Sequence, residues 1–280
     1  MRRFDTVAIL GVGLIGGSIG LALRRRKLAS QVIGIGRRPE SLRVALEMGA
    51  ITSSTLVSAE GVAAADLVIV CTPVGRIVDD VRHVAAHCRP QALITDVGST
   101  KGRIVADLND SLPNGVRFIG SHPLAGSERS GPAAAEADLL VDRVVVVTPV
   151  AATRPDDLED LCGFWLNLGA RVVQMAADEH DRALAATSHV PHLVAAALAA
   201  ATPDEVLGLT AGGWGDCTRI AAGDPELWRQ IFVGNREPLL ASLRQFEECL
   251  SVFRAAIERR DDDALVELLT AAKHRRDKVT

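Results

Sequence analysis

The chain of 280 residues lacks any excess of positive charge. It has 31 lysines and arginines against 35 aspartates and glutamates, which gives a formal net charge of −4 at pH 7. The basic cluster from Arg24 to Lys27 is short, and it is better explained as the C-terminal end of a helix than as a binding patch. This charge balance argues against nucleic acid as the main partner.

The chain also lacks cysteines at C-x-x-C spacing and any long apolar run. Its cysteines are five, an odd number, which predicts free thiols in a reducing compartment. No apolar leader follows Met1-Arg2-Arg3, so we expect no signal peptide and a cytoplasmic location. The longest apolar stretch, 190–201, contains Pro191 and His192 and is too short to span a bilayer, so we expect no membrane partner.

Short β-branched runs alternate with amphipathic segments through the first 175 residues. The strand candidates are 7–10, 32–35, 67–71, 92–95, 117–120, 143–148 and 171–175, with a short one at 51–52. Helices are predicted between them, for example at 18–23, 40–48, 76–88 and 103–108. This alternation is typical of an α/β fold with a parallel, Rossmann-type doubly wound sheet.

From Asp178 onward the β-branched runs stop, and the rest is predicted to be helical. The expected helices are 178–201, 204–211, 224–232, 235–258 and 262–277, with start signals at Asp204, Asp224 and Asp261. We therefore predict a first domain at 1–176 and a helical domain at 177–280, with a substrate cleft between them. The helical domain is so apolar that a lone copy would expose a large patch, which predicts a homodimer formed through it.

A glycine motif follows the first predicted strand. The segment Gly11-Val12-Gly13-Leu14-Ile15-Gly16 has the G-x-G-x-x-G spacing and leads into an apolar helix. Such a loop lets the backbone turn tightly and approach a pyrophosphate, and the helix N-terminus offers N–H groups to the anion. We therefore predict that 1–176 binds a dinucleotide, with Gly11, Gly13, Leu14, Ile15 and Gly16 in contact with it.

The end of the second predicted strand bears on the choice of cofactor. An acidic residue is expected there if a ribose 2′-hydroxyl is to be bound, as in NAD. This chain has Gly36 instead, followed by Arg37 and Arg38. A guanidinium can bind a 2′-phosphate through two hydrogen bonds, so the sequence favours NADP over NAD. The alternative is a solvated turn, with NAD held by other groups.

Polar residues that could do chemistry follow three neighbouring strands. Thr72-Pro73, Ser99 and His122 all come after strand candidates and should converge on the nicotinamide end of the site. His122 is expected in a Pro/Gly-rich loop, as a base that meets the substrate. The helical domain adds the segments 188–192, with Ser188 and His192, and 212–219, with Arg219.

At this point the sequence resembles the prephenate/arogenate dehydrogenase family of tyrosine biosynthesis. The matching segments run in family order over nearly the whole chain: GVGLIGGS at the start, TDVGSTKG at 95–102, GSHPLAGSERSG at 120–131, SHVPH at 188–192 and DCTRIAAGDPELW at 216–228. The resemblance implies oxidative decarboxylation: hydride leaves the carbinol carbon of a cyclohexadienol for the nicotinamide, the ring carboxylate leaves as CO2, and the ring becomes aromatic.

The resemblance also implies roles for single residues. His122 corresponds to the histidine that takes the proton of the ring hydroxyl, and Ser99 to the hydroxyl group near it. Arg219 corresponds to the arginine that binds a substrate carboxylate. By similarity, Ser188 and His192 line the same pocket, and Ser127, Glu128, Asp216 and Trp228 stand around its entrance, some contributed by the partner subunit.

The chain departs from the family pattern in two places. The family's Gly-Phe-Arg-Asp appears as Gly213-Trp214-Gly215-Asp216, so a guanidinium at the pocket entrance is missing. Position 226 is Glu, and an acidic residue near that point accompanies arogenate, whose side chain carries an ammonium, rather than prephenate. The sequence therefore leans toward accepting arogenate.

Other interpretations stay open beside this one. A β-hydroxyacid dehydrogenase or imine reductase shares the two-domain plan, but the first group uses a lysine on the long helix of the second domain, and here the lysines after 176 are Lys273 and Lys278. A nucleotide-sensing protein without catalysis would bind cofactor and turn nothing over. Arg219 could instead pair with a nearby aspartate, and we expect no metal, although His189 and His192 have a ligand-like spacing. We expect Trp214 and Trp228 in the core or an interface.

Overall fold

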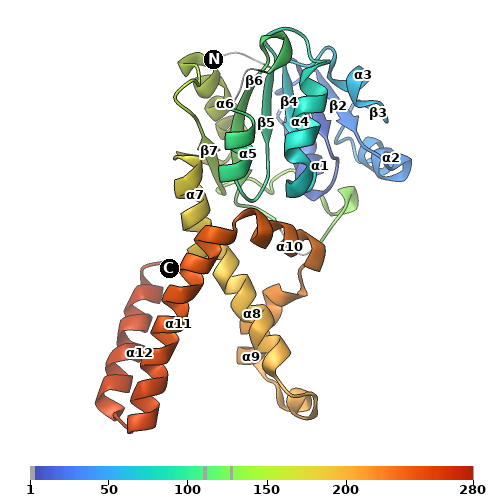
Figure 1. The fold of residues 1–280 in the computed structure, drawn as a ribbon. Helices are drawn as coiled ribbons and strands as arrows, with labels where there is room; N and C mark the ends of the chain where they lie inside the picture. Colours follow the sequence, from blue (N-terminus) through green and yellow to red (C-terminus); the bar gives the residue numbers. More distant parts are fainter. Residues whose placement is uncertain (1–3, 110–111, 127–128, 280) are drawn as a thin grey trace.

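The computed structural model describes residues 4–109, 112–126 and 129–279. Its N-terminal part is an eight-stranded sheet with the order β3-β2-β1-β4-β5-β6-β7-β8 (Figure 1). The strands are β1 (Thr6–Leu10), β2 (Gln31–Ile35), β3 (Ser53–Thr55), β4 (Leu67–Val70), β5 (Leu93–Asp96), β6 (Arg117–Pro123), β7 (Val144–Thr148) and β8 (Arg171–Gln174). The first six strands have the Rossmann order, which reverses at β1 and confirms the predicted fold class.

The sheet is not wholly parallel, contrary to the prediction. β6 and β7 pair antiparallel, while β8 returns to the parallel direction beside β7. The cause is the connection 124–143, whose described residues contain no α-helix that crosses the sheet and which starts β7 beside the end of β6, with Pro123 opposite Val145. β-branched content cannot distinguish the two directions, because both strands are buried on this part of the sheet.

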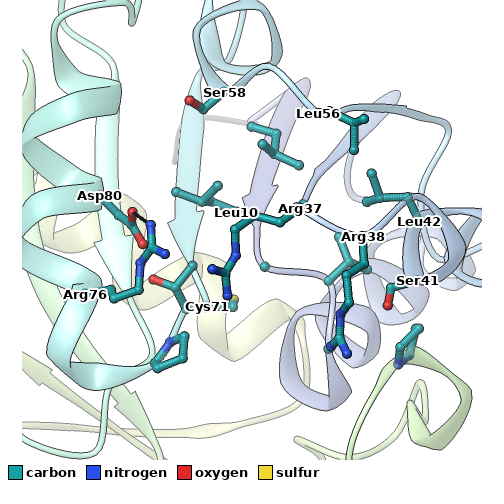
Figure 2. A pocket seen from close by; sticks show the side chains of 18 of the residues that line it. Leu10, Arg37, Arg38, Ser41, Leu42, Leu56, Ser58, Cys71, Arg76 and Asp80 are labelled. Carbon is teal, nitrogen blue, oxygen red and sulfur yellow. Dashed lines mark hydrogen bonds and ion pairs between the residues drawn. The ribbon is translucent and has the colours of Figure 1, made fainter.

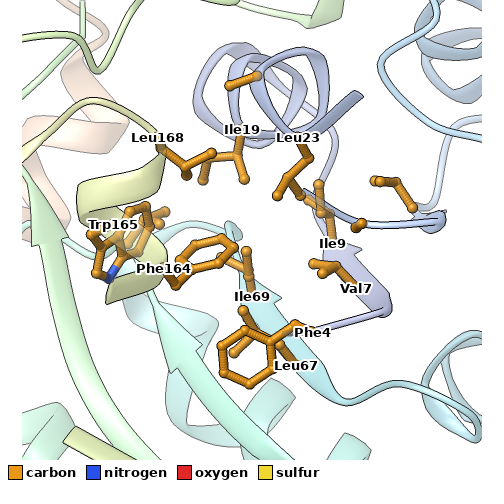
Figure 3. Close-up of a cluster of buried hydrophobic side chains, with 14 of the residues drawn as sticks. Phe4, Val7, Ile9, Ile19, Leu23, Leu67, Ile69, Phe164, Trp165 and Leu168 are labelled. Atoms are coloured by element: carbon orange, nitrogen blue, oxygen red, sulfur yellow. The ribbon is translucent and has the colours of Figure 1, made fainter. Parts of the chain in front are cut away.

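Six helices cover the two faces of the sheet. They are α1 (Leu14–Arg25), α2 (Pro39–Glu47), α3 (Ser58–Val62), α4 (Ile77–Ala85), α5 (Gly102–Asp107) and α6 (Pro155–Asn167). One core lies under α1, α2 and α6, where Ile19, Leu23, Phe164 and Trp165 meet the sheet (Figure 3). The second core lies under α3, α4 and α5. Each face therefore has its own dry layer, as doubly wound folds require.

The C-terminal part is helical, as predicted. Its elements are α7 (Ala177–Leu184), a π turn (Ala185–His189), α8 (Val190–Ala201), η5 (Asp204–Leu209), α9 (Gly212–Thr218), η6 (Arg219–Ala222), α10 (Pro225–Gly234), α11 (Arg236–Arg259) and α12 (Asp262–Asp277). Asp224 and Asp261 cap α10 and α12 by accepting backbone N–H bonds, whereas Asp204 caps no α-helix. α8 with α9, and α11 with α12, form two arms that extend away from the sheet (Figure 1).

The first helices of this part run without a break from Ala177 to Ala201. This run of 25 residues, predicted as a helix at 178–201, is long and apolar enough to cross a membrane by length and composition alone, a test that core helices also pass. Its buried side chains nevertheless include His180, Asp181 and His189. Polar groups of this kind are costly in hydrocarbon, and here they face the protein interior.

Candidate active site

A cavity of about 600 Å³ lies at the carboxyl ends of β1, β2 and β4 (Figure 2). Ligands of doubly wound folds bind at this edge, next to the reversal of strand order. Six of the predicted cofactor residues line the cavity: Gly11, Gly13, Arg37, Arg38, Thr72 and Pro73. The other three, Leu14, Ile15 and Gly16, form the first turn of α1 and are not among its lining residues.

The glycine loop has the shape that a dinucleotide needs. Gly11 has a φ of +98°, and a Cβ there would lie 2.7 Å from the carbonyl oxygen of Cys71. A Cβ on Gly16 would lie 2.3 Å from the carbonyl oxygen of Gly11, whereas a Cβ on Gly13 would meet nothing within 4 Å. Gly13 therefore leaves room for a pyrophosphate. The first intrahelical bond of α1 is made by the Gly17 N–H, so earlier N–H groups suit an anion.

Two arginines follow β2 in the wall of this cavity. Arg37 and Arg38 are exposed, and Figure 2 shows both among the side chains that surround the pocket. Neither has an ion-pair partner among the residues that the structure describes. A third arginine of the wall, Arg76, bonds Asp80 at 3.1 Å. The end of β2 therefore offers two guanidinium groups to an anion and no carboxylate.

A second cavity of about 620 Å³ lies between the sheet and the helical part. One side comes from β6 and the segment after it, and the other from the π turn, α8, η6 and α10. Five of the predicted catalytic and substrate residues line it together: Ser99, His122, Ser188, His192 and Arg219. The structure thus brings to one cavity residues that the sequence scatters over both parts of the chain.

His122 lies in a strand, not in the predicted loop. β6 continues to Pro123 because residues 120–123 pair with β7. Burial is the largest cause that lowers the pKa of His122 well below its usual value, and the nearby His180, Lys101 and His189 act in the same direction. The imidazole is therefore neutral at pH 7, the form that can accept a proton.

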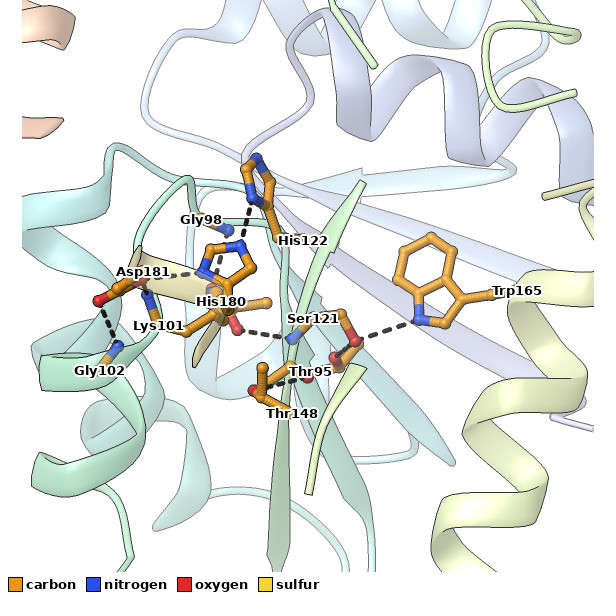
Figure 4. Close-up of polar contacts among 12 residues, drawn as sticks. Thr95, Gly98, Lys101, Gly102, Ser121, His122, Thr148, Trp165, His180 and Asp181 are labelled. Carbon is orange, nitrogen blue, oxygen red and sulfur yellow. Dashed lines mark hydrogen bonds and ion pairs between the residues drawn. The ribbon is translucent and has the colours of Figure 1, made fainter. Parts of the chain in front are cut away.

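A buried chain of hydrogen bonds starts at His122 (Figure 4). The Nδ1 atom of His122 lies 2.8 Å from Nε2 of His180, and Nδ1 of His180 lies 2.8 Å from Oδ1 of Asp181. The Asp181 carboxylate also accepts the backbone N–H groups of Lys101 and Gly102, both at 2.8 Å. One carboxylate on α7 therefore holds both the histidine pair and the start of α5.

A second polar branch fixes the loop that carries Ser99. The ammonium of Lys101 is ion-paired with Asp96, and both side chains are fully buried. Asp96 also accepts the N–H groups of Ser121 at 3.2 Å and Gly98 at 2.8 Å. Burial lowers the pKa of Lys101, and the charge of Asp96 opposes that shift. The loop after β5 is thus tied to β6 by bonds between buried groups.

The π turn at Ala185–His189 affects where the polar side chains of the run 177–201 point. The N–H of Val190 bonds the carbonyl of Ala185, five residues back, which makes this turn wider than an α turn. Pro191 supplies a physical reason: it has no N–H, and its ring would clash with the carbonyl four residues earlier in a regular helix. Such wide turns are frequent at functional sites, and this one carries Ser188 and His189.

An aromatic wall closes the far side of the cavity. The ring of His192 stacks on Trp228 with 3.5 Å between centroids and 13° between planes. Trp228, expected at the pocket entrance and in the core or an interface, is among the residues that line the cavity. Burial lowers the pKa of His192, and it is the main cause that lowers the pKa of His189 to about 4. Both imidazoles are neutral parts of the wall.

Several predicted residues lie elsewhere. Glu226 is exposed on α10, bonded to Arg229 and Gln230, and its pKa is lowered to about 2 mainly by the bonds from Arg229. It is not among the residues that line the cavity. Asp216 is exposed and is not a lining residue either. Ser127 and Glu128 lie outside the described residues.

Two of the open interpretations can be compared with the structure. Among the described residues, Arg219 forms no ion pair, with Asp216 or with any other acid. In the same part of the chain no group of three or more histidine, cysteine, aspartate or glutamate side chains could hold a metal ion. His180, which lies on the same helical run as His189 and His192, bonds His122.

Sequence reasoning missed the support of His122. Asp181 and Lys101 were assigned no role, although both contribute to the buried network. A signal was present: Lys101 is one of only four lysines in the chain and stands two residues after Ser99. Asp181 directly follows a histidine at the start of the helical domain. Asp181 and Lys101 stand out as supports of the site because they are buried, and burial cannot be read from a sequence.

Comparisons with known proteins fit this geometry. Residues 19–174 match the family model described as prephenate dehydrogenase, nucleotide-binding domain, and residues 176–271 match prephenate dehydrogenase, dimerization domain. The chain belongs to the prephenate dehydrogenase family. It is therefore an NAD(P)-dependent dehydrogenase.

Relatives in this family resemble the chain over nearly its whole length. It is 35% identical to a prephenate dehydrogenase of Bacillus subtilis over 98% of this chain and 76% of that protein. The crystal structure of prephenate dehydrogenase from Aquifex aeolicus, in complex with hydroxyphenyl propionate and NAD+, matches with a TM-score of 0.91, 33% identity, and 99% and 98% coverage of the two chains. Synechocystis arogenate dehydrogenase matches with a TM-score of 0.83, 29% identity, and 98% and 100% coverage.

Proposed function

We propose that this member of the family catalyses the oxidative decarboxylation of prephenate or arogenate. The products would be 4-hydroxyphenylpyruvate or tyrosine, with CO2 and the reduced cofactor. The observation that carries the proposal is the single cavity lined by Ser99, His122 and Arg219, beside the nucleotide cavity at the glycine loop. A neutral buried base, a hydroxyl and a guanidinium are the groups that a carboxylated cyclohexadienol requires.

His122 would take the proton of the ring hydroxyl. Its Nδ1 atom is engaged with His180, so Nε2 is the ring nitrogen left for the substrate. When bound, the nicotinamide supplies the hydride acceptor. His122 polarises the hydroxyl as the hydride leaves, holds the proton while the ring carboxylate departs as CO2, and can return it to the phenolate oxygen. Atoms and charge then balance without a further base.

The other lining residues would orient the substrate. Arg219 can hold a substrate carboxylate in a bidentate pair, since it forms no ion pair among the described residues. Ser99 stands in a loop fixed by Lys101 and Asp96, so its hydroxyl is available near the reacting oxygen. Ser188 and His192 would contact the ring or its side chain. Glu226 is engaged with Arg229 outside the cavity, so its charge gives arogenate no advantage within one chain.

We propose NADP as the preferred cofactor. Gly36 stands where an acidic residue would bind a ribose hydroxyl, and Arg37 and Arg38 line the same end of the cavity. Two guanidinium groups at the end of β2 favour a 2′-phosphate, and of the two carboxylates that line the same cavity, Asp79 and Asp80, the second is paired with Arg76. In the alternative, Arg37 and Arg38 form a solvated turn and NAD is held by other groups of the cavity.

We also propose a homodimer formed through the two helical arms. Large apolar side chains are exposed along both arms: Leu198, Leu209, Leu250, Ile257 and Val266. Apolar groups gathered in this way are typical of an interface between subunits. Ser127 and Glu128 lie outside the described residues, and their role near the pocket entrance stays a prediction from the resemblance.

Absorbance at 340 nm tests the function directly. Purified protein is mixed with prephenate or arogenate, each with NAD and with NADP, and reduced cofactor is expected in at least one mixture, fastest with NADP. His122→Asn should lower kcat by about 100- to 10,000-fold and leave cofactor affinity unchanged. Turnover of 3-hydroxyisobutyrate instead would favour a β-hydroxyacid dehydrogenase. Cofactor binding with no turnover of either cyclohexadienol would favour a nucleotide sensor.

A further inference from the structure

The proton positions in the chain of His122, His180 and Asp181 can be deduced from its bonding partners. The Asp181 carboxylate accepts the N–H groups of Lys101 and Gly102, so it acts as an acceptor on both oxygens. Its third partner, Nδ1 of His180 at 2.8 Å, must then be a donor. A neutral imidazole that donates from Nδ1 accepts at Nε2.

The same logic continues to His122. Because Nε2 of His180 accepts, the proton between the two rings belongs to Nδ1 of His122, 2.8 Å away. A neutral His122 with its proton on Nδ1 has a lone pair on Nε2, on the side of the substrate cavity. With a neutral His180, the opposite arrangement would need a protonated Asp181, which the two backbone donors disfavour.

We propose that Asp181 and His180 are positioning residues, which hold His122 in the tautomer whose Nε2 can accept the substrate proton. This inference rests on the proposed function, in which His122 is the base. When His122 gains a proton, the negative charge of Asp181 lies at the other end of the chain and stabilises the cation through His180. Histidine bases in other enzymes depend on a buried aspartate in the same two ways.

The position of Asp181 gives this chain a second effect. Its bonds to Lys101 and Gly102 begin α5 and fix the end of the loop that carries Ser99. Asn235 of the helical part donates to the Asp181 carbonyl at 2.7 Å and lies 3.0 Å from Nδ1 of His189. Asp181 therefore fixes the positions of three groups relative to each other: the base His122, the loop that carries Ser99, and the cavity wall at His189.

Ring nitrogen NMR of histidine-labelled protein tests the tautomer without substrate. The chain has seven histidines, and the His122 signals are those absent from His122→Asn. We expect Nε2 of His122 unprotonated in the wild type. In His180→Phe, which keeps a ring but no acceptor, the protonated Nε2 form should become populated. An Nε2 that stays unprotonated in His180→Phe would overturn the proposal.

Turnover tests the same idea by a matched pair of variants. His180→Phe should lower kcat by about 100-fold with little change in KM or cofactor affinity. His180→Gln can again accept the Nδ1 proton with its amide oxygen, so it should recover part of this loss. The control is His87→Gln. His87 is exposed, lines neither cavity, and bonds the backbone carbonyl of His83, so this variant should match the wild type.

Two results would separate the possible failures. Equal losses in His180→Phe and His180→Gln, together with weaker cofactor binding, would mean that His180 only supports the fold, and the proposal would be wrong. A wild-type protein with an unprotonated Nε2 and no turnover of either cyclohexadienol would contradict the proposed function and leave the tautomer assignment intact.

Discussion

The two parts of this chain differ in how completely they bury their apolar residues. The sheet and its helices enclose two dry cores, and Trp165, Ile19 and Leu67 are almost fully buried there. The helical arms instead leave residues such as Leu209 and Leu250 at 82% and 57% exposure. The first part is therefore complete within one chain, whereas the second has the surface of a protein that needs a partner. The substrate cavity lies where the two meet.

The largest effect on the free energy of unfolding should come from replacing a tryptophan by alanine in the sheet part, compared with the same replacement in the helical part. Trp165→Ala removes a fully buried ring that also donates to Ser121 at 3.1 Å, and it should cost about 3–5 kcal/mol of the free energy of unfolding. Trp214→Ala, in the half-buried α9, should cost about 1–2 kcal/mol. Urea unfolding measures both. Equal costs would mean that the helical part is packed as tightly as the sheet.

Arg219→Ala should act on the substrate alone. Loss of a guanidinium that holds a carboxylate should raise KM for the cyclohexadienol by about 100-fold, because a charge-assisted pair contributes about 2–3 kcal/mol. Cofactor affinity, which depends on the first part of the chain, should not change. Steady-state kinetics measure KM for the cyclohexadienol, and a cofactor titration measures cofactor affinity. An equal loss of affinity for substrate and for cofactor would contradict the assignment of the two ligands to separate cavities.

A pair of exposed leucines tests the dimer. Leu250 on α11 and Leu166 on α6 have similar exposure, 57% and 54%. Leu250→Asp should raise the dissociation constant of the dimer by about 10-fold or more, because it places a charge on an apolar interface. Leu166→Asp should leave it unchanged. Analytical ultracentrifugation over a dilution series measures both, and dissociation in the Leu166 variant alone would move the interface to the sheet.

The smallest effect should come from the cofactor arginines. Arg38→Ala should raise KM for NADP by about 10-fold and leave KM for NAD nearly unchanged, because only NADP has the 2′-phosphate. The helical part takes no part in this choice, so substrate KM should stay constant. A parallel rise in KM for both cofactors would show that Arg38 supports the pocket rather than the phosphate.

The fold was largely predictable because its signals are local. Buried parallel strands read as β-branched runs, and the glycine loop needs Gly16 for a close contact with Gly11 inside its own βαβ unit. The antiparallel β7 was missed because direction depends on a connection, not on composition. His122 was placed in a loop because proline and glycine follow it, whereas pairing with β7 extends the strand.

The site was predictable only where its residues face the cavity. Ser99, His122, Ser188, His192 and Arg219 were named from motifs, and the structure brings them together. Asp181 supports those residues from a position about 80 residues further along the chain, so no local pattern marks it, whereas Lys101 stands two residues after Ser99 and only its burial is hidden from the sequence. Glu226 bonds Arg229, three residues away on the same helix, outside the cavity of one chain, and its role toward the substrate stays a prediction.

The π turn at Ala185–His189 makes the length of this segment part of the active site. A helix advances by about 100° per residue, and the wide turn takes in one residue more than an α turn for nearly the same rotation, so the helices on either side of it stay in phase. Insertion of one residue after this turn and before His192 would turn His192 by about 100° away from the cavity with its chemistry untouched. Here an insertion or a deletion would be more damaging than many substitutions, because it changes the phase of a helix and not merely one side chain.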